Sequence, residues 1–140
     1  MMTKLTANDG HAESELHAEA WAGDVDGVAR VLDSGFDVNW QDSIGETALF
    51  GAVAWAENAV VVLLLARGAQ VSVQNNEGWS PLHWAASHGG VDMIDLLVAH
   101  GADAHLADHA GAKAIDIARR YGKGDRVARL KMLMGKRSRS

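Results

Sequence analysis

The chain has 140 residues, 48% of them apolar and 22% charged, which fits one small folded domain or one short array of repeats. The absence of cysteine excludes a disulfide scaffold, a cysteine nucleophile, an iron–sulfur cluster and a cysteine-based zinc site. The net charge of −5 hides an asymmetry, because residues 1–118 contain 4 Lys and Arg against 17 Asp and Glu, whereas residues 119–140 contain 9 against one. An acidic body disfavours nucleic acid and membrane surfaces as partners and favours basic proteins.

Neither a signal peptide nor a membrane span is visible in the sequence. The first fifteen residues lack the apolar segment that a secretory signal requires. The longest apolar run, residues 59–66, is far shorter than the ~20 residues that cross a bilayer. We therefore expect a cytoplasmic protein.

The sequence repeats itself with a period of 33 residues. Each unit contains two short segments of helical apolar spacing, and the clearest begins at Ser80-Pro81, an N-cap followed by a proline suited to the first helical position. The equivalent positions that reveal the period are Gly45, Gly78 and Gly111; Gly35, Gly68 and Gly101; and Leu16, Leu49, Leu82 and Ile115. In chain order we predict helices over residues 14–22, 25–33, 47–55, 58–66, 80–88, 91–99, 113–121 and 124–134.

The third unit resembles an ankyrin repeat. It reads GWSPLHWAASHG over residues 78–89 and DLLVAHGAD over 95–103, with Ser80-Pro81-Leu82-His83 at the place of the family's T-P-L-H signature. Weaker copies occur at residues 47–50 and 14–17, and residues 113–122 resemble a C-terminal ankyrin repeat.

The resemblance covers about residues 12–134 and implies an all-α solenoid, in which stacked helix–turn–helix units bury one another's apolar faces and carry loop fingers. We expect four repeats, at about residues 12–44, 45–77, 78–110 and 111–134. They would lie between a flexible N-terminus, residues 1–11, and a basic tail, residues 135–140.

Three positions depart from the repeat pattern. Ala56 stands where the other units have a turn glycine at Gly23, Gly89 and Gly122. Either this turn keeps a positive φ, which costs Ala about 1 kcal/mol, or it is rebuilt around Glu57-Asn58. Glu19 replaces an alanine of the middle units, which suits an end repeat where the carboxylate reaches water. Val62 is expected to be an exposed apolar side chain on the second helices.

The resemblance also implies a binding face. Ankyrin stacks bind partners through a concave surface made by the finger tips and the last exposed turn of each first helix. Carried over column by column, the residues expected to bind the partner are Trp21, Ile44, Glu46, Trp55, Glu77, Trp79, His88, His109, Arg120 and Tyr121.

Aromatic side chains are concentrated on this expected face. Trp21, Trp55, Trp79 and Tyr121 fall on positions expected to face solvent, and exposed aromatic patches mark interaction sites. Another interpretation is that these rings pack on one another and stabilise the stack. The two remaining tryptophans fall on columns expected to be partly buried, and they are Trp40 and Trp84.

Carboxylates would border the aromatic patch with negative charge. Glu46 and Glu77 belong to the expected site, and Asp42 lies beside it. The complementary protein partner would present apolar anchors among Lys and Arg side chains.

The sequence gives little support to a metal site or to catalysis. His100, His105 and His109 lie close together but do not share a helix face at the spacing that metal ligation favours. By the resemblance, His17 and His83 hydrogen-bond between loops. No G-x-S-x-G, G-x-x-x-x-G-K or H-E-x-x-H motif is present. We therefore expect no cofactor, no metal and no enzymatic activity.

We predict a non-catalytic protein-binding module, present as a monomer, that occupies its partner as an inhibitor, an immunity-type protein or an adaptor. Two alternatives remain open. The first is a structural homodimer formed through Val62 and the second helices or through the exposed tryptophans. The second is nucleic-acid contact through the basic segment at residues 136–140, which otherwise acts as a solubilising cap.

Overall fold

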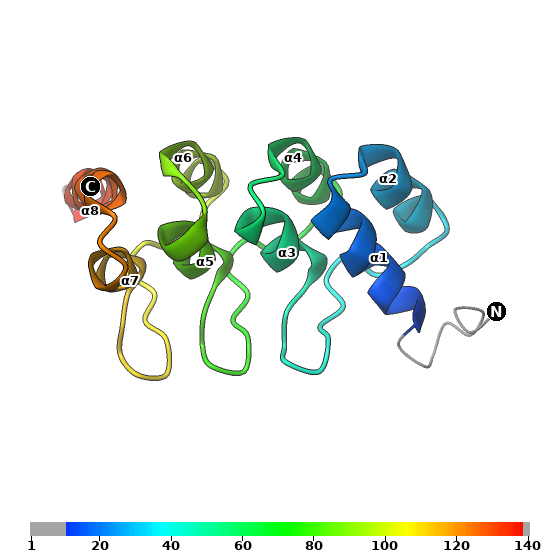
Figure 1. Cartoon of the computed structure of the whole chain (residues 1–140), viewed down its shortest axis with the longest axis horizontal. Helices are drawn as coiled ribbons and strands as arrows, with labels where there is room; N and C mark the ends of the chain where they lie inside the picture. Colours follow the sequence, from blue (N-terminus) through cyan, green and yellow to red (C-terminus); the bar gives the residue numbers. More distant parts are fainter. Residues whose placement is uncertain (1–10, 139–140) are drawn as a thin grey trace.

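The chain folds into two rows of short helices, seen here in a computed structural model that describes residues 11–138. Figure 1 shows an inner row formed by the odd-numbered helices and an outer row formed by the even-numbered helices. The described residues contain eight helices and no strand: α1 (His11–Ala22), α2 (Val25–Asp33), α3 (Ala48–Ala54), α4 (Asn58–Ala66), α5 (Pro81–His88), α6 (Val91–Ala99), α7 (Ala114–Arg120) and α8 (Gly124–Ser138).

The predicted all-α solenoid of four helix pairs is confirmed. Three loops, at residues 34–47, 67–80 and 100–113, extend from the inner row on the side away from the outer helices, and we call them fingers 1, 2 and 3 (Figure 1). Within residues 11–138, no helix has both the length and the apolar character that crossing a membrane requires.

The ends of the stack differ from the expected helix boundaries. Helix α1 begins at His11, three residues earlier than predicted, and the rest of the expected flexible N-terminus lies outside the described residues. Helix α8 continues to Ser138, so residues 135–138 of the expected tail are helical, and residues 139–140 are not described.

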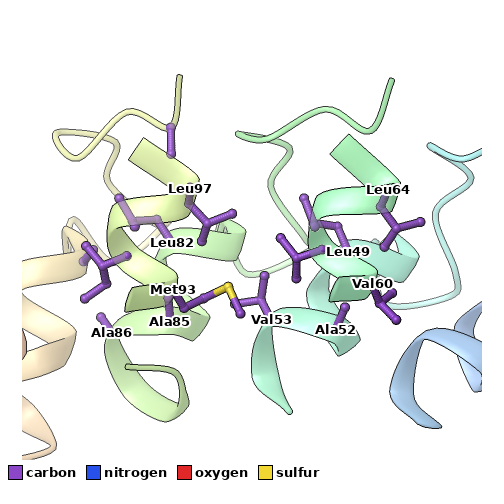
Figure 2. Packing of buried hydrophobic residues seen from close by; sticks show 14 of the residues in the cluster. Leu49, Ala52, Val53, Val60, Leu64, Leu82, Ala85, Ala86, Met93 and Leu97 are labelled. Atoms are coloured by element: carbon purple, nitrogen blue, oxygen red, sulfur yellow. The ribbon is translucent and has the colours of Figure 1, made fainter. Parts of the chain in front are cut away.

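The core follows the leucine column of the repeat. Leu16, Leu49 and Leu82 expose 1% or less of their surface, and Ile115 of the last repeat exposes 7%. Figure 2 shows how neighbouring repeats share the core, with the Met93 side chain reaching from α6 toward Val53 of α3. Each repeat therefore depends on its neighbour for burial of its apolar face.

The glycine column at the finger tips is explained by backbone geometry. Gly45, Gly78 and Gly111 have φ values of 84°, 84° and 86°, which disfavour any side chain. At Gly45 a Cβ atom would also lie 2.6 Å from the Asn76 amide oxygen of the next finger. The glycines thus permit both the turn and the close stacking of fingers.

The turn after each inner helix follows the expectation in three of four repeats. Ala56 keeps a positive φ of 56°, beside Gly23 at 74° and Gly122 at 70°, so the strained alternative is the one observed. The expectation was wrong for Gly89, whose φ is −83°. Space explains this glycine instead, because its Cβ would lie 2.8 Å from the Ala85 Cα atom.

Candidate protein-binding face

The ends of the inner helices and the tips of the fingers expose several large apolar side chains. Trp21 follows this pattern with 56% of its surface exposed, Ile44 with 54%, Trp55 with 63% and Tyr121 with 45%. These four were all predicted to belong to the binding site, and their exposure is the condition that a binding role requires. Val62, on outer helix α4, is 48% exposed, as expected for that position.

The Trp21 indole lies across the backbone of α3. A Cβ atom built on Gly51 would overlap the Nε1 and Cδ1 atoms of Trp21, so only glycine at this position admits the ring. Gly51 is itself buried although it lies in the middle of a helix. One face of Trp21 therefore stabilises the contact between α1 and α3, and the rest of the ring remains exposed.

An aromatic ladder connects finger 2 with the last repeat. We give this name to Trp79, Trp84, His88 and Tyr121, whose successive ring centroids are 5.1, 5.2 and 5.8 Å apart. Edge-to-face and tilted contacts at these separations are favourable for aromatic rings. The ladder is consistent both with binding a partner and with stabilising the stack. Its inner members pack on each other, while His88 and Tyr121 stay exposed.

Trp79 is the one predicted solvent-facing aromatic residue that the structure places differently. Its ring is half-buried, stacks on His83 with centroids 5.9 Å apart, and donates its indole N–H to Asp108 Oδ2 over 3.1 Å. Trp79 is thus less exposed than its expected solvent-facing position implied, because the next finger supplies a carboxylate for the indole. Trp40 and Trp84 are half-buried, as expected.

Glu46 connects three repeats. Its Oε2 atom accepts hydrogen bonds from Asn75 Nδ2 at 2.8 Å and from Trp84 Nε1 at 3.0 Å, and its backbone carbonyl accepts one from His17 Nε2 at 2.9 Å. The carboxylate is half-buried, whereas Glu77, also predicted to border the patch, is exposed. Glu46 therefore positions the ladder as well as contributing negative charge.

A column of turn residues escaped the sequence reasoning. Asp42, Asn75 and Asp108 each accept two backbone N–H groups of their own finger on Oδ1, and they are spaced by the 33-residue period. Such side chains mimic a turn in the backbone, and the shared spacing was the signal that could have revealed them. Burial alone would raise the pKa of Asp108. The Ala112 and Ala110 N–H groups, His83 and the Trp79 indole outweigh burial and hold the Asp108 pKa below its ordinary 3.8.

Of the two histidines in the signature column, His83 joins finger 2 to finger 3, as expected, whereas His17 joins helix α1 to finger 1. His17 Nε2 donates to the Glu46 carbonyl and His83 Nε2 donates to the Ala112 carbonyl, both at 2.9 Å. The His83 Nδ1 atom accepts from the Ser80 backbone N–H at 3.1 Å and contacts the Ser80 hydroxyl at 2.9 Å. This ring is only 1% exposed, so its role is structural.

Positive charge is absent from most of the face. Between residues 11 and 112 the only Lys and Arg are Arg30 and Arg67. Both belong to the outer side of the stack, where Arg30 lies 3.7 Å from Glu19 and Arg67 lies 2.8 Å from Asp33. The face of the first three repeats thus combines aromatic rings with carboxylates, and cations appear only from Lys113 onward.

The remaining predicted site residues lie near the third finger and the last repeat. His109 is exposed at a finger tip, where its N–H donates to the Glu77 carbonyl over 3.0 Å. Arg120 is exposed at the end of α7, next to Tyr121. The two residues extend the face beyond the aromatic ladder in the direction of the basic end.

Of the histidines considered as metal ligands, His100 uses a ring nitrogen in another contact. His100 Nδ1 donates to the Leu96 carbonyl over 2.9 Å. The backbone N–H of His105 donates to Asp103 Oδ1. In the part of the chain that the structure describes, no group of three His, Asp or Glu side chains is placed to hold a metal ion.

Comparison with known proteins agrees with this architecture. The family model described as ankyrin repeats, in three copies, matches residues 16–127. Similar curated proteins include the E3 ubiquitin-protein ligase KEG of Arabidopsis thaliana, 35% identical over 58% of this chain, and the RelA-associated inhibitor of Mus musculus, 37% identical over 49%. The Neurogenic locus Notch protein of Drosophila melanogaster is 37% identical over 56%. The chain spans only 5%, 8% and 3% of the length of these three relatives. The chain belongs to the ankyrin-repeat family.

Proposed function

We propose that this chain is a non-catalytic protein-binding module whose concave face engages a partner rich in Lys, Arg and apolar side chains. The observation that carries the proposal is the presence of exposed Trp21, Trp55 and Tyr121 on a face that has no Lys or Arg before Lys113. Ankyrin repeats generally mediate protein–protein interaction, and domains of this family are typically non-catalytic.

The exposed rings are suited to supply the binding energy. Covering one such ring removes on the order of 100 Å² of apolar surface from water, which is worth about 2–3 kcal/mol before the costs of association. A Lys or Arg side chain of the partner gains further from ring faces and from nearby Glu77. The binding mode therefore combines apolar anchors with positive charge.

We infer that the module is cytoplasmic, is a monomer before it binds, and acts by occupying its partner. This mode covers three roles: an inhibitor, an immunity-type protein or an adaptor. One relative is itself named an inhibitor. The acidic charge of residues 1–118 favours rapid encounter with a basic partner.

The test compares captured proteins from native lysate by mass spectrometry. The baits are the wild type, a Trp55→Ala/Tyr121→Ala variant and a Val62→Ala control on the outer row. Circular dichroism first establishes that all three are folded. We expect a basic partner that the wild type and the control retain and that the double variant loses. Equal retention by all three baits would place binding outside the concave face, and an acidic partner on that face would contradict the charge argument.

Self-association is the second candidate, favoured by the exposure of Val62. It predicts a mass that rises with concentration in light scattering, and a Val62→Asp variant that stays monomeric. Contact of nucleic acid with residues 136–140 is the third candidate. It predicts salt-sensitive binding that deletion of these residues abolishes.

A further inference from the structure

Among the described residues, the last helix pair has a neighbouring repeat on one side only. Helix α7 packs on α5 and α8 packs on α6. Figure 1 shows no described helix on their opposite side. We call this surface the end face and define it by Lys113, Ile115, Arg119, Lys123, Val127, Lys131 and Met134.

Two open hollows lie on the end face. One, of about 530 Å³, is lined by residues of finger 3, α7 and α8, and the other, of about 480 Å³, lies at the turn between α7 and α8. Both include Arg119 and Lys131, so these two side chains stand between the hollows. An occupant that spans both hollows would contact them together.

The charges of the end face are unbalanced. The first hollow contains Lys113, Arg119 and Lys131 against a single acid, Asp116, and the second contains three cations and no acid. Asp116 is already engaged, because it accepts the Lys113 backbone N–H at 2.9 Å and Arg119 Nη1 at 3.3 Å. Among the described residues, the ammonium groups of Lys113, Lys123 and Lys131 form no ion pair.

The floor of the hollows is apolar. Val127 lines one of them, and Ile115 and Met134 line the other. Ile115 is almost buried, whereas Val127 and Met134 are half-buried and can be covered further. Methionine adapts readily to the shape of an occupant. The surface therefore offers cations around an apolar centre.

We propose that the end face binds an acidic, partly apolar protein segment, a helix with Asp or Glu beside Leu-type side chains. Such a helix would take the place of a fifth repeat against α7 and α8 and would pair with the unpaired cations. A nucleic acid or a lipid headgroup layer also carries negative charge. Either presents its charge over a surface that extends past the end face to the acidic first 118 residues and is repelled there, whereas a single acidic helix stays on the end face. A nucleic acid also has no aliphatic side chains for the apolar floor. The proposal does not depend on the concave face.

The test measures binding of a fluorescein-labelled helical peptide with one Glu face and one Leu face, by fluorescence anisotropy at low and high salt. The test variant is Lys113→Gln/Lys131→Gln, and the matched control is Arg30→Gln/Arg67→Gln, which removes the same charge from the outer side of the stack. Unfolding curves establish that both variants are folded. The test variant would lose two partly exposed ion pairs with the peptide, so we expect its affinity to fall roughly fivefold. The affinity of the control should not change.

Three results would overturn the proposal. One is the absence of peptide binding to the wild type. Another is equal weakening in the test and control variants, which would show a general charge effect. The third is tighter binding of a single-stranded RNA oligonucleotide or of phosphatidylserine vesicles than of the peptide, with the same dependence on Lys113 and Lys131. A peptide with Lys in place of Glu should not bind.

Discussion

Among single residues, Ala56 carries the clearest backbone strain. It is the one described non-glycine residue with a positive φ, and its neighbour Trp55, 63% exposed, is the most exposed of the described large apolar side chains. Relief of the left-handed strain outweighs the larger chain entropy of glycine, so Ala56→Gly should raise the free energy of unfolding by about 0.5–1 kcal/mol. Urea unfolding measures this. The control Ala128→Gly, at an exposed position in the interior of helix α8, should instead lower stability by about 1 kcal/mol. A lower free energy of unfolding in Ala56→Gly than in the wild type would contradict the inference that the Ala56 backbone is strained.

A second single residue, His83, makes the stability of the fold depend on pH. Burial lowers its pKa below the ordinary 6.5, although the Ala112 carbonyl and the charges of Asp108 and Asp116 act in the opposite direction. Above 6.5 the ring is neutral in both states and its contribution is fully present. Below 6.5 the unfolded chain binds the proton first, so stability falls, by at most about 1.4 kcal/mol per pH unit.

The free energy of unfolding is measured as a function of pH, from the ordinary histidine pKa of 6.5 down to the pH range in which carboxylates titrate. We expect the wild type to lose stability in this window and a His83→Gln variant to show a shallower slope. All other side chains are the same in the two proteins, so the difference between the two slopes isolates His83. Parallel slopes would show that His83 does not carry the effect.

At the scale of helices, equivalent N-caps of neighbouring repeats are built differently. Ser80 caps α5 in a capping box with His83. Thr47 precedes α3 with no side-chain cap bond, and its buried hydroxyl has no hydrogen-bond partner among the described residues. Ser80→Ala should therefore cost about 1–2 kcal/mol, whereas Thr47→Val, which removes an unsatisfied hydroxyl, should cost less than about 0.5 kcal/mol or stabilise.

Thermal or urea unfolding of the two variants, measured side by side, tests this difference. Equal losses would mean that the Thr47 hydroxyl has a hydrogen-bond partner in solution. A larger loss for Thr47→Val would point to a cap like that of Ser80.

The sequence predicted the helices better than the contacts between fingers. The 33-residue period and the glycine and leucine columns determine where the helices begin and end and where the chain turns between them, because these features are local. Glu46 and Trp79 were expected at the partner interface, yet both hydrogen-bond to residues 29 or more positions away. Such pairings depend on how repeats are offset in space, which a single repeat does not encode. Ala56 illustrates the same limit, since its sequence allowed either of two turns.

For the whole molecule, the quasi-one-dimensional stack makes the last repeat separable from the rest. The five tryptophans lie between residues 21 and 84, so their fluorescence reports the first three repeats, whereas circular dichroism reports all helices. Leu130 of α8 is fully buried, and α8 packs on α6 and α7. Leu130→Ala should lower the free energy of unfolding by about 2–4 kcal/mol, and most of this loss should fall on the last repeat.

We expect the wild type to unfold with coincident fluorescence and circular-dichroism transitions. In Leu130→Ala the helical signal should fall at a lower urea concentration than the tryptophan signal. In the control Leu49→Ala, a buried residue of the interior helix α3, both transitions should shift together, because an interior repeat is coupled to neighbours on both sides. Coincident transitions in Leu130→Ala would mean that the interface between repeats is strong enough to make the four units unfold as one, and the end face would then be as rigid as the centre of the stack.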